Sequence, residues 1–145
     1  MENIDLKKLT LDDYPLTTYD KIRYGDTDRQ DHVNNAVFAT FLETGRTELL
    51  YNPDQPLYSE GGSFVIAKLN LNLLAELKWP GKVEIGTAIK DIGSSSVKIV
   101  QSLYQKGKVA ATAETVIVHI DKEENKSKPL SEEAKVTLNK YKLEK

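Results

Sequence analysis

A helical period in the hydrophobic positions follows Asn34 and Asn35, either of which can cap a helix. Apolar side chains recur there three and four residues apart, with small residues between them, which is typical of a helix with a buried face. The residues concerned are Val37, Phe38, Ala39, Phe41, Leu42, Gly45, Leu49 and Leu50. The pattern therefore predicts a helix of about four turns, ended by Asn52, Pro53 and Pro56.

A period of two dominates the chain on both sides of this helix. Thr and Tyr are frequent before it, and hydrophobic and polar residues alternate after it, as in half-buried strands. Breaks with turn residues occur at Gly93, Ser94 and Ser95 and around Gly107. The segments predicted as strands are 16–24, 68–73, 83–90, 97–103 and 109–121. We expect the last four to form consecutive antiparallel hairpins.

The last part of the chain, 123–145, is rich in charged residues. Pro129 and the cap-like Ser131 precede Glu132 and Glu133, which favours a short helix. This tail is expected to be a surface helix or a frayed end.

The predicted order of one strand, one long helix and four strands is that of an α+β fold. The helix has apolar or small residues on most of its circumference, so we expect an antiparallel sheet wrapped around it rather than an open sheet beneath it.

Length and composition indicate one ordinary globular domain. The 145 residues predict a single domain over 1–145, with a core of about 17–121 and the charged tail 122–145. Hydrophobic residues make up 39% and charged residues 29%, which argues against disorder. The net charge of -2 does not favour a nucleic-acid partner.

The absence of Cys excludes disulfides, thiolate metal sites and a cysteine nucleophile. No apolar run approaches the length of a membrane span, and residues 1–8 do not resemble a signal peptide. A cytoplasmic protein with no membrane partner is the expectation.

Polar functional groups concentrate between the first strand and the helix, in Tyr24-Gly25-Asp26-Thr27-Asp28-Arg29-Gln30-Asp31-His32-Val33-Asn34-Asn35. The carboxylate of Asp28 and the imidazole of His32 precede a helix N-terminus, whose free N–H groups and dipole favour negative charge. A carboxylate can attack a thioester or activate water, while N–H donors stabilise the oxyanion that forms. This combination suits acyl transfer.

The same residues resemble those of the hotdog-fold acyl-CoA thioesterases of the 4-hydroxybenzoyl-CoA thioesterase type. The resemblance lies in Tyr-x-Asp-x-Asp followed by His-Val-Asn-Asn and a helix. It extends over about 17–121, and includes Phe41-Leu42-Glu43 with Arg46, Pro80-Gly81, and Ile92 to Ser96. It implies a hotdog fold and hydrolysis of an acyl-CoA thioester to the free acid and coenzyme A.

The resemblance also implies roles for individual residues. Asp28 would be the nucleophile or general base, Asp26 would be structural, and the backbone N–H of Asn35 would hold the thioester carbonyl oxygen. His32 would line the acyl pocket, orient water or hydrogen-bond the loop. Asn34 and the segment Gly93, Ser94 and Ser95 are candidates for substrate binding, although Gly93 to Ser95 fit a plain hairpin turn equally well.

Acyl-CoA is the expected small-molecule substrate, and no metal or other cofactor is expected. An unpaired sheet edge needs a partner, so we expect a homodimer with a continuous sheet, and the resemblance implies two active sites at its interface. The dimers could pair again into a tetramer.

Other residues in and near the motif have simpler explanations. Relatives commonly have Gly where this chain has Asp31, and Asp tolerates the left-handed conformation that this position requires. Glu43 is an alternative catalytic carboxylate, but its spacing from Arg46 favours a helix-surface ion pair. His119, in an apolar strand, is expected to be a structural histidine.

Two other functions are compatible with the same fold. A non-catalytic module that binds acyl thioesters would not need Asp28. A hotdog dehydratase of 3-hydroxyacyl thioesters would need an Asp and His pair at the α and β carbons, which the sequence does not supply.

Overall fold

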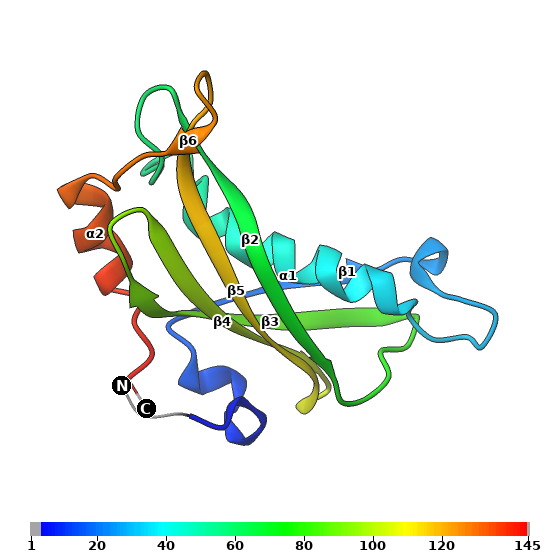
Figure 1. Ribbon diagram of the computed structural model, residues 1–145. Coiled ribbons are helices and arrows are strands. Elements are labelled where there is room, and N and C mark those ends of the chain that lie inside the picture. Colours follow the sequence, from blue (N-terminus) through cyan, green and yellow to red (C-terminus); the bar gives the residue numbers. More distant parts are fainter. Residues whose placement is uncertain (1–3, 145) are drawn as a thin grey trace.

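An antiparallel sheet curls around a long helix in the computed structural model, which describes residues 4–144 (Figure 1). The helices are α1 (Asn35–Leu50) and α2 (Glu132–Asn139), with the 3-10 turns η1 (Leu6–Lys8), η2 (Leu11–Asp13) and η3 (Tyr24–Asp26). The strands are β1 (Leu16–Ile22), β2 (Gly62–Leu73), β3 (Gly81–Ile92), β4 (Ser96–Gln105), β5 (Lys108–Asp121) and β6 (Lys126–Ser127). The predicted α+β class, with a sheet curled around the predicted helix, is confirmed. Within residues 4–144, neither helix combines the length and the apolar character needed to cross a membrane.

The strand order is β1-β3-β4-β5-β2, with β6 paired to β5. Strands β3, β4 and β5 form the predicted hairpins. Strand β2, however, pairs with β5 along its whole length, from Gly62 opposite Asp121 to Leu73 opposite Ala111. The prediction of a hairpin between the second and third strands is therefore wrong, and residues 74–80 instead connect the two sides of the curled sheet.

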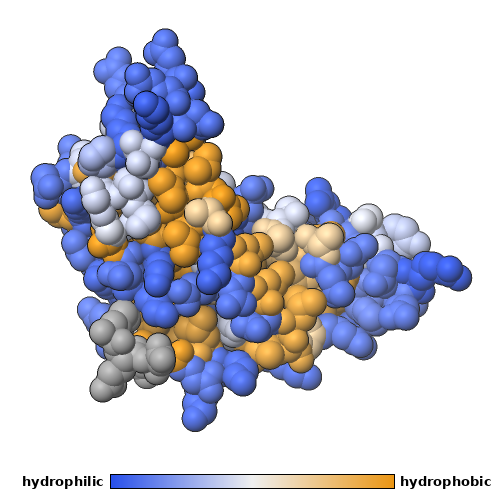
Figure 2. Space-filling model, in the orientation of Figure 1, coloured by the Kyte–Doolittle hydropathy of each residue, from blue (hydrophilic) through white to orange (hydrophobic). Residues whose placement is uncertain are grey.

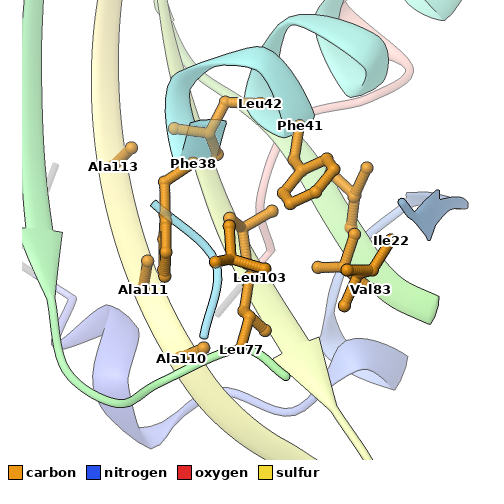
Figure 3. Packing of buried hydrophobic residues seen from close by; sticks show 12 residues of the cluster. Ile22, Phe38, Phe41, Leu42, Leu77, Val83, Leu103, Ala110, Ala111 and Ala113 are labelled. Carbon is orange, nitrogen blue, oxygen red and sulfur yellow. The ribbon is translucent and has the colours of Figure 1, made fainter. Parts of the chain in front are cut away.

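The main hydrophobic core lies between α1 and the concave face of the sheet. Figure 3 shows Phe41 pointing toward Ile22 and Val83, and Phe38 lying beside Ala111. Leu77, from the 74–80 connection, fills the end of this core and is fully buried. The opposite side of α1 is exposed in the single chain and carries Asn35, Ala36, Thr40, Glu43, Thr47 and Glu48. The sheet therefore covers one side of the helix.

The N-terminal segment covers the convex face of β3 and β4. Leu9 and Tyr14 pack with Ala88, Val100 and Tyr104, and the Tyr104 hydroxyl donates to the Leu9 carbonyl oxygen at 2.8 Å. Burial raises the pKa of Tyr14 above its ordinary value. Strand β3 is consequently buried on both faces, so the prediction of a half-buried strand is wrong here.

Strand β2 differs from its prediction in both position and exposure. It starts at Gly62, six residues before the predicted segment, because Phe64 to Ala67 are apolar without alternation. Leu69 and Leu73 are exposed, so β2 is not half-buried in the single chain. No strand within residues 4–144 pairs with its outer edge.

The C-terminal tail belongs to the core. Ser131 caps α2 by accepting from the Ala134 N–H at 3.0 Å. Leu130, Ala134 and Leu138 are buried in a second cluster with residues of α1, β3, β4 and β5. The N–H of Ile89 donates to the Tyr141 carbonyl oxygen at 2.8 Å. The expectation of a surface helix or frayed end is therefore wrong, and buried residues extend beyond position 121.

Candidate active site

The loop before α1 is anchored by Asp26. The buried Asp26 carboxylate accepts from the Arg23 backbone N–H at 2.8 Å and from the Arg23 guanidinium at 3.0 Å. The Asp26 carbonyl oxygen accepts from the Asn34 N–H at 2.8 Å, which joins the two ends of the loop. Asp26 is thus placed for the structural role that was predicted for it.

Asp28 lies at the exposed tip of this loop. Its carboxylate accepts from the Gln30 N–H at 2.8 Å, and its own N–H donates to the His32 carbonyl oxygen at 2.9 Å. Asp31 closes the turn with a φ of 67°, the left-handed conformation anticipated for this position. Asparagine and aspartate adopt this conformation more readily than most residues, so the turn forms without glycine.

The first turn of α1 presents one backbone N–H without an intramolecular acceptor. The Asn34 side chain accepts from the Ala36 N–H at 3.0 Å, and the Asn34 carbonyl oxygen accepts from the Val37 N–H at 2.9 Å. The Asn35 N–H has no acceptor among residues 4–144. An unpaired N–H at a helix start binds negative charge well, because the helix dipole adds to the hydrogen bond.

A groove of about 690 Å³ opens beside this N–H. Its walls come from the loop before α1, from α1, from the end of β2 with the 74–80 connection, and from the start of β5. The lining residues are His32, Val33, Asn35, Phe38, Leu73, Leu74, Ala75, Glu76, Lys78 and Lys108. Asp28 is outside this lining, and its carboxylate is turned onto Gln30.

Glu76 is a site residue that the sequence did not reveal. Its carboxylate oxygen lies 3.5 Å from Nε2 of His32, in the groove. The hydrophobic positions in 74–80 follow neither a helical nor a strand period. Backbone pairing of His32 with Lys78 brings Glu76 to this position. No sequence signal identified it.

The 74–80 connection is held rigidly at the site. The Leu77 carbonyl oxygen accepts from the Val33 N–H at 2.8 Å, and the Ala110 carbonyl oxygen accepts from Leu74 and Ala75. The Gln105 side chain bonds both the N–H and the carbonyl oxygen of Lys78. Hydrogen bonds to Val33, Ala110 and Gln105 therefore hold the 74–80 connection in place beside the groove.

A family model described as the thioesterase-like superfamily matches residues 22–138. The chain belongs to the thioesterase-like superfamily. The groove and the unpaired Asn35 N–H lie inside the matched segment.

Individual relatives agree with this family. An Escherichia coli protein named acyl-CoA thioester hydrolase YbgC is 28% identical over 116 residues, 77% of this chain and 84% of that protein. A predicted thioesterase from Bacillus stearothermophilus has a TM-score of 0.80 at 26% identity, covering 88% of this chain and 96% of its own. A Thermus thermophilus thioesterase, complexed with coenzyme A and zinc, has a TM-score of 0.75 at 26% identity, covering 87% and 92%. The predicted hotdog fold and thioester hydrolase class are thus confirmed.

Some predicted residues of this thioesterase-like chain lie far from the groove. Gly93, Ser94 and Ser95 form the turn after β3, whereas the 74–80 connection, which lines the groove, lies directly before β3. The twelve residues of β3 separate the two ends by about 35 Å, at roughly 3.3 Å per residue. Within the chain, Ser94 and Ser95 accept from the N–H groups of Leu130 and His119. Contact of this turn with substrate stays a prediction.

The predicted surface ion pair between Glu43 and Arg46 is wrong. The Arg46 side chain is buried on the sheet side of α1, where its guanidinium donates to Oε1 of Gln101 in β4 at 3.4 Å. No carboxylate within residues 4–144 lies within 4.0 Å of it, while Glu43 is exposed. Burial lowers the pKa of Arg46, and attraction to Glu43 at longer range opposes this shift.

His119 is the predicted structural histidine of this chain. It is fully buried, and its Nε2 accepts from the Ser59 N–H at 3.2 Å. Its Nδ1 therefore carries the proton and donates to the Lys128 carbonyl oxygen at 3.0 Å. In residues 4–144, no three His, Asp or Glu side chains gather closely enough to hold a metal ion.

Proposed function

We propose that this protein hydrolyses an acyl-CoA thioester to the free acid and coenzyme A in the groove at the start of α1. The observation that carries the proposal is Asn35, which lines a groove of a thioesterase-like fold and whose backbone N–H has no acceptor within residues 4–144. The E. coli relative is named an acyl-CoA thioester hydrolase, and the T. thermophilus relative holds coenzyme A. Acyl-CoA is accordingly the proposed substrate.

In the proposed reaction, the thioester carbonyl oxygen accepts a hydrogen bond from the Asn35 N–H. This donor and the dipole of α1 stabilise the negative charge that develops on the oxygen as the carbon becomes tetrahedral. Asp28 either attacks the carbonyl carbon or removes a proton from an attacking water. If Asp28 attacks, the carbon–sulfur bond breaks to give an anhydride between Asp28 and the acyl group, and water then cleaves this anhydride to the free acid and regenerates the carboxylate. If Asp28 acts as a base, water adds to the carbon, the carbon–sulfur bond breaks, and the proton that Asp28 removed passes to the thiolate.

Asp28 must turn toward the groove for either role. Within residues 4–144, its carboxylate accepts one hydrogen bond, from the N–H of the exposed Gln30, so rotation of the side chain breaks only that bond. His32 lies in the groove beside Glu76, and we assign to it the orientation of the attacking water. Asn34 already uses its side-chain oxygen to cap α1, so a contact with substrate would come from its amide nitrogen.

A second copy of the chain completes the proposed site. The outer edge of β2 has no partner strand within residues 4–144, and Val65, Ile66, Leu69 and Leu73 are exposed along it. Figure 2, in the orientation of Figure 1, shows a continuous hydrophobic band across this side of the molecule. Pairing of two β2 edges would bury this band and extend the sheet through a homodimer.

The test is thiol release from short, medium, long-chain and aryl acyl-CoAs. Asp28→Asn is expected to lower the rate by roughly 100-fold or more, as for loss of a nucleophile or base. Asp31→Asn is the matched control, because it removes an equally exposed carboxylate from the same turn and asparagine tolerates its left-handed backbone. It is expected to leave the rate nearly unchanged.

Three results would contradict parts of this proposal. Full activity of Asp28→Asn would exclude Asp28 and turn attention to Glu43. Binding of acyl-CoA without turnover of any substrate would favour a non-catalytic binding module. Hydration of crotonyl-CoA would favour the dehydratase.

A further inference from the structure

A second cavity of about 320 Å³ adjoins the groove. The two spaces share Ala75, Glu76, Lys78 and Lys108 in their walls. Asn35 and His32 line only the first, whereas Lys106 and Gln105 line only the second. The two cavities therefore adjoin at the 74–80 connection and the start of β5, and the second one lies at the turn between β4 and β5.

We propose that Lys106 and Lys108, together with Lys78, bind the phosphate groups of coenzyme A in this second cavity, where Lys106 is the lysine that lines the second cavity alone. The assignment rests on the proposed function, and it adds which part of the substrate the second cavity recognises. In coenzyme A the pantetheine arm separates the thioester sulfur from the phosphates, so the phosphates must lie away from the oxyanion position. Ammonium groups on flexible stems are suited to bind phosphate oxygens.

The charges in the second cavity are available for a ligand. Neither Lys106 nor Lys108 has a carboxylate within 4.0 Å in the part of the chain that the structure describes. Lys78 lies 4.0 Å from Glu76, whose other oxygen faces His32. Lys90, in contrast, pairs closely with Glu114 at 3.2 Å. Three lysines and one glutamate give this end of the groove an excess of positive charge.

The backbone conformation of Lys106 also supports the proposal. Lys106 and Gly107 have φ values of 53° and 78°, and they form a two-residue hairpin turn between β4 and β5. Such turns favour Asn-Gly, because asparagine adopts the left-handed conformation more easily than lysine does. Lysine is therefore a poor choice for the turn itself, and its charge at the cavity gives a reason for its presence.

The groove offers apolar surface that suits the pantetheine arm. Leu73, Leu74 and Ala75 supply apolar surface along the first space. The N–H groups of Leu74 and Ala75 already bond the Ala110 carbonyl oxygen, so this stretch is rigid. Apolar surface in the groove that Asn35 lines, next to a cavity lined by lysines, suits a substrate whose pantetheine arm joins a thioester to phosphates.

The experiment compares one acyl group on two carriers, coenzyme A and N-acetylcysteamine, which lacks phosphates. The combined change Lys106→Asn with Lys108→Gln is expected to raise KM for the acyl-CoA by about 10-fold, as for loss of two exposed charge contacts. The kcat for acyl-CoA and both constants for the N-acetylcysteamine thioester should stay nearly constant. Since asparagine favours the turn, Lys106→Asn alone should not lower the unfolding midpoint.

The matched control is Lys122→Asn with Lys126→Gln, which removes the same charge from the other end of β5, near β6. It is expected to leave KM for acyl-CoA unchanged. Equal KM values in the groove variant and the unmodified protein would overturn the proposal, as would equal increases for both carriers. If the groove variant raised KM for a carrier-protein thioester but not for acyl-CoA, the assignment to coenzyme A would be overturned.

Equilibrium binding separates failure of this proposal from failure of the proposed function. If no thioester is hydrolysed, the affinity for coenzyme A and for pantetheine is measured by titration calorimetry. A loss of affinity for coenzyme A alone in the groove variant supports the lysine assignment without any catalysis. Unchanged affinity for coenzyme A would overturn it.

Discussion

Three aspartates within six residues of one loop have different surroundings. Asp26 is buried and accepts hydrogen bonds from Arg23, Asp28 is exposed and accepts from Gln30, and Asp31 supplies a left-handed backbone. The left-handed backbone at Asp31 was anticipated from its residue type, whereas the structural role of Asp26 was expected only from the resemblance to the thioesterases. The orientation of Asp28 could not be, because it depends on a side-chain rotation.

Gly45 shows how one residue sets the distance between α1 and the sheet. A Cβ at this position would lie 2.7 Å from Nε2 of Gln101 and from Cγ2 of Ile85, and 2.8 Å from Oγ1 of Thr87. Gln101 cannot move aside freely, because its amide donates to the Leu42 carbonyl oxygen and to Thr87. The helix can therefore approach the sheet this closely only with glycine here.

Gly45→Ala is expected to destabilise the protein by about 1 to 3 kcal/mol through overpacking, although alanine favours a helix by about 1 kcal/mol. Urea unfolding followed by circular dichroism measures the difference. Gly25→Ala is the control, because no atom lies within 4 Å of its added Cβ, and its effect should stay within about 0.5 kcal/mol. Equal stability of both variants would show that α1 can shift away from the sheet.

At the scale of elements, α2 and the N-terminal turns complete cores that the central elements leave open. Helix α2 covers residues of α1, β3 and β4, while η1 and η2 border the cluster on the convex face of β3 and β4. Both segments are short and highly charged, so their hydrophobic content alone gave little sign of burial. Their burial therefore depends on the apolar sheet surface that they cover, not on their own composition.

Leu138→Ala is expected to lower the free energy of unfolding by about 2 to 5 kcal/mol, because Leu138 is fully buried in the second cluster. Val136→Ala, on the exposed face of the same helix, should change it by no more than about 0.5 kcal/mol. Denaturant midpoints of the two variants provide the comparison. A small effect of Leu138→Ala would mean that α2 contributes little to the core.

At the scale of the whole molecule, the exposed edge of β2 is the feature that a single chain leaves incomplete. Ile66 is 50% exposed and Val65 is 43% exposed, next to the bulge at Ala67. An apolar strand with free N–H and carbonyl groups is a surface that soluble proteins normally cover. A second copy paired along β2 would cover it.

Ile66→Lys is expected to convert the proposed dimer to monomer at micromolar concentration, since a charge would have to be buried at the pairing edge. Sedimentation velocity measures the two species. Val136→Lys, at another exposed apolar position, should leave the association unchanged. A protein that sediments as a monomer without any substitution would refute pairing along β2.

The sequence by itself determined the types of the main elements and the resemblance of the loop before α1 to the thioesterases. Hydrophobic period, caps and turn residues act over a few neighbouring positions, so they placed α1, the core strands, the conformation of Asp31 and the capped helix start.

Only the tertiary structure decided which distant residues meet. Glu76 reaches His32, Arg46 turns inward to Gln101, α2 joins the core and β2 takes the sheet edge. A period reports which face of an element is apolar, but not which element covers that face. That choice depends on strand order and on how the sheet curls, which are set by contacts between residues far apart in the chain.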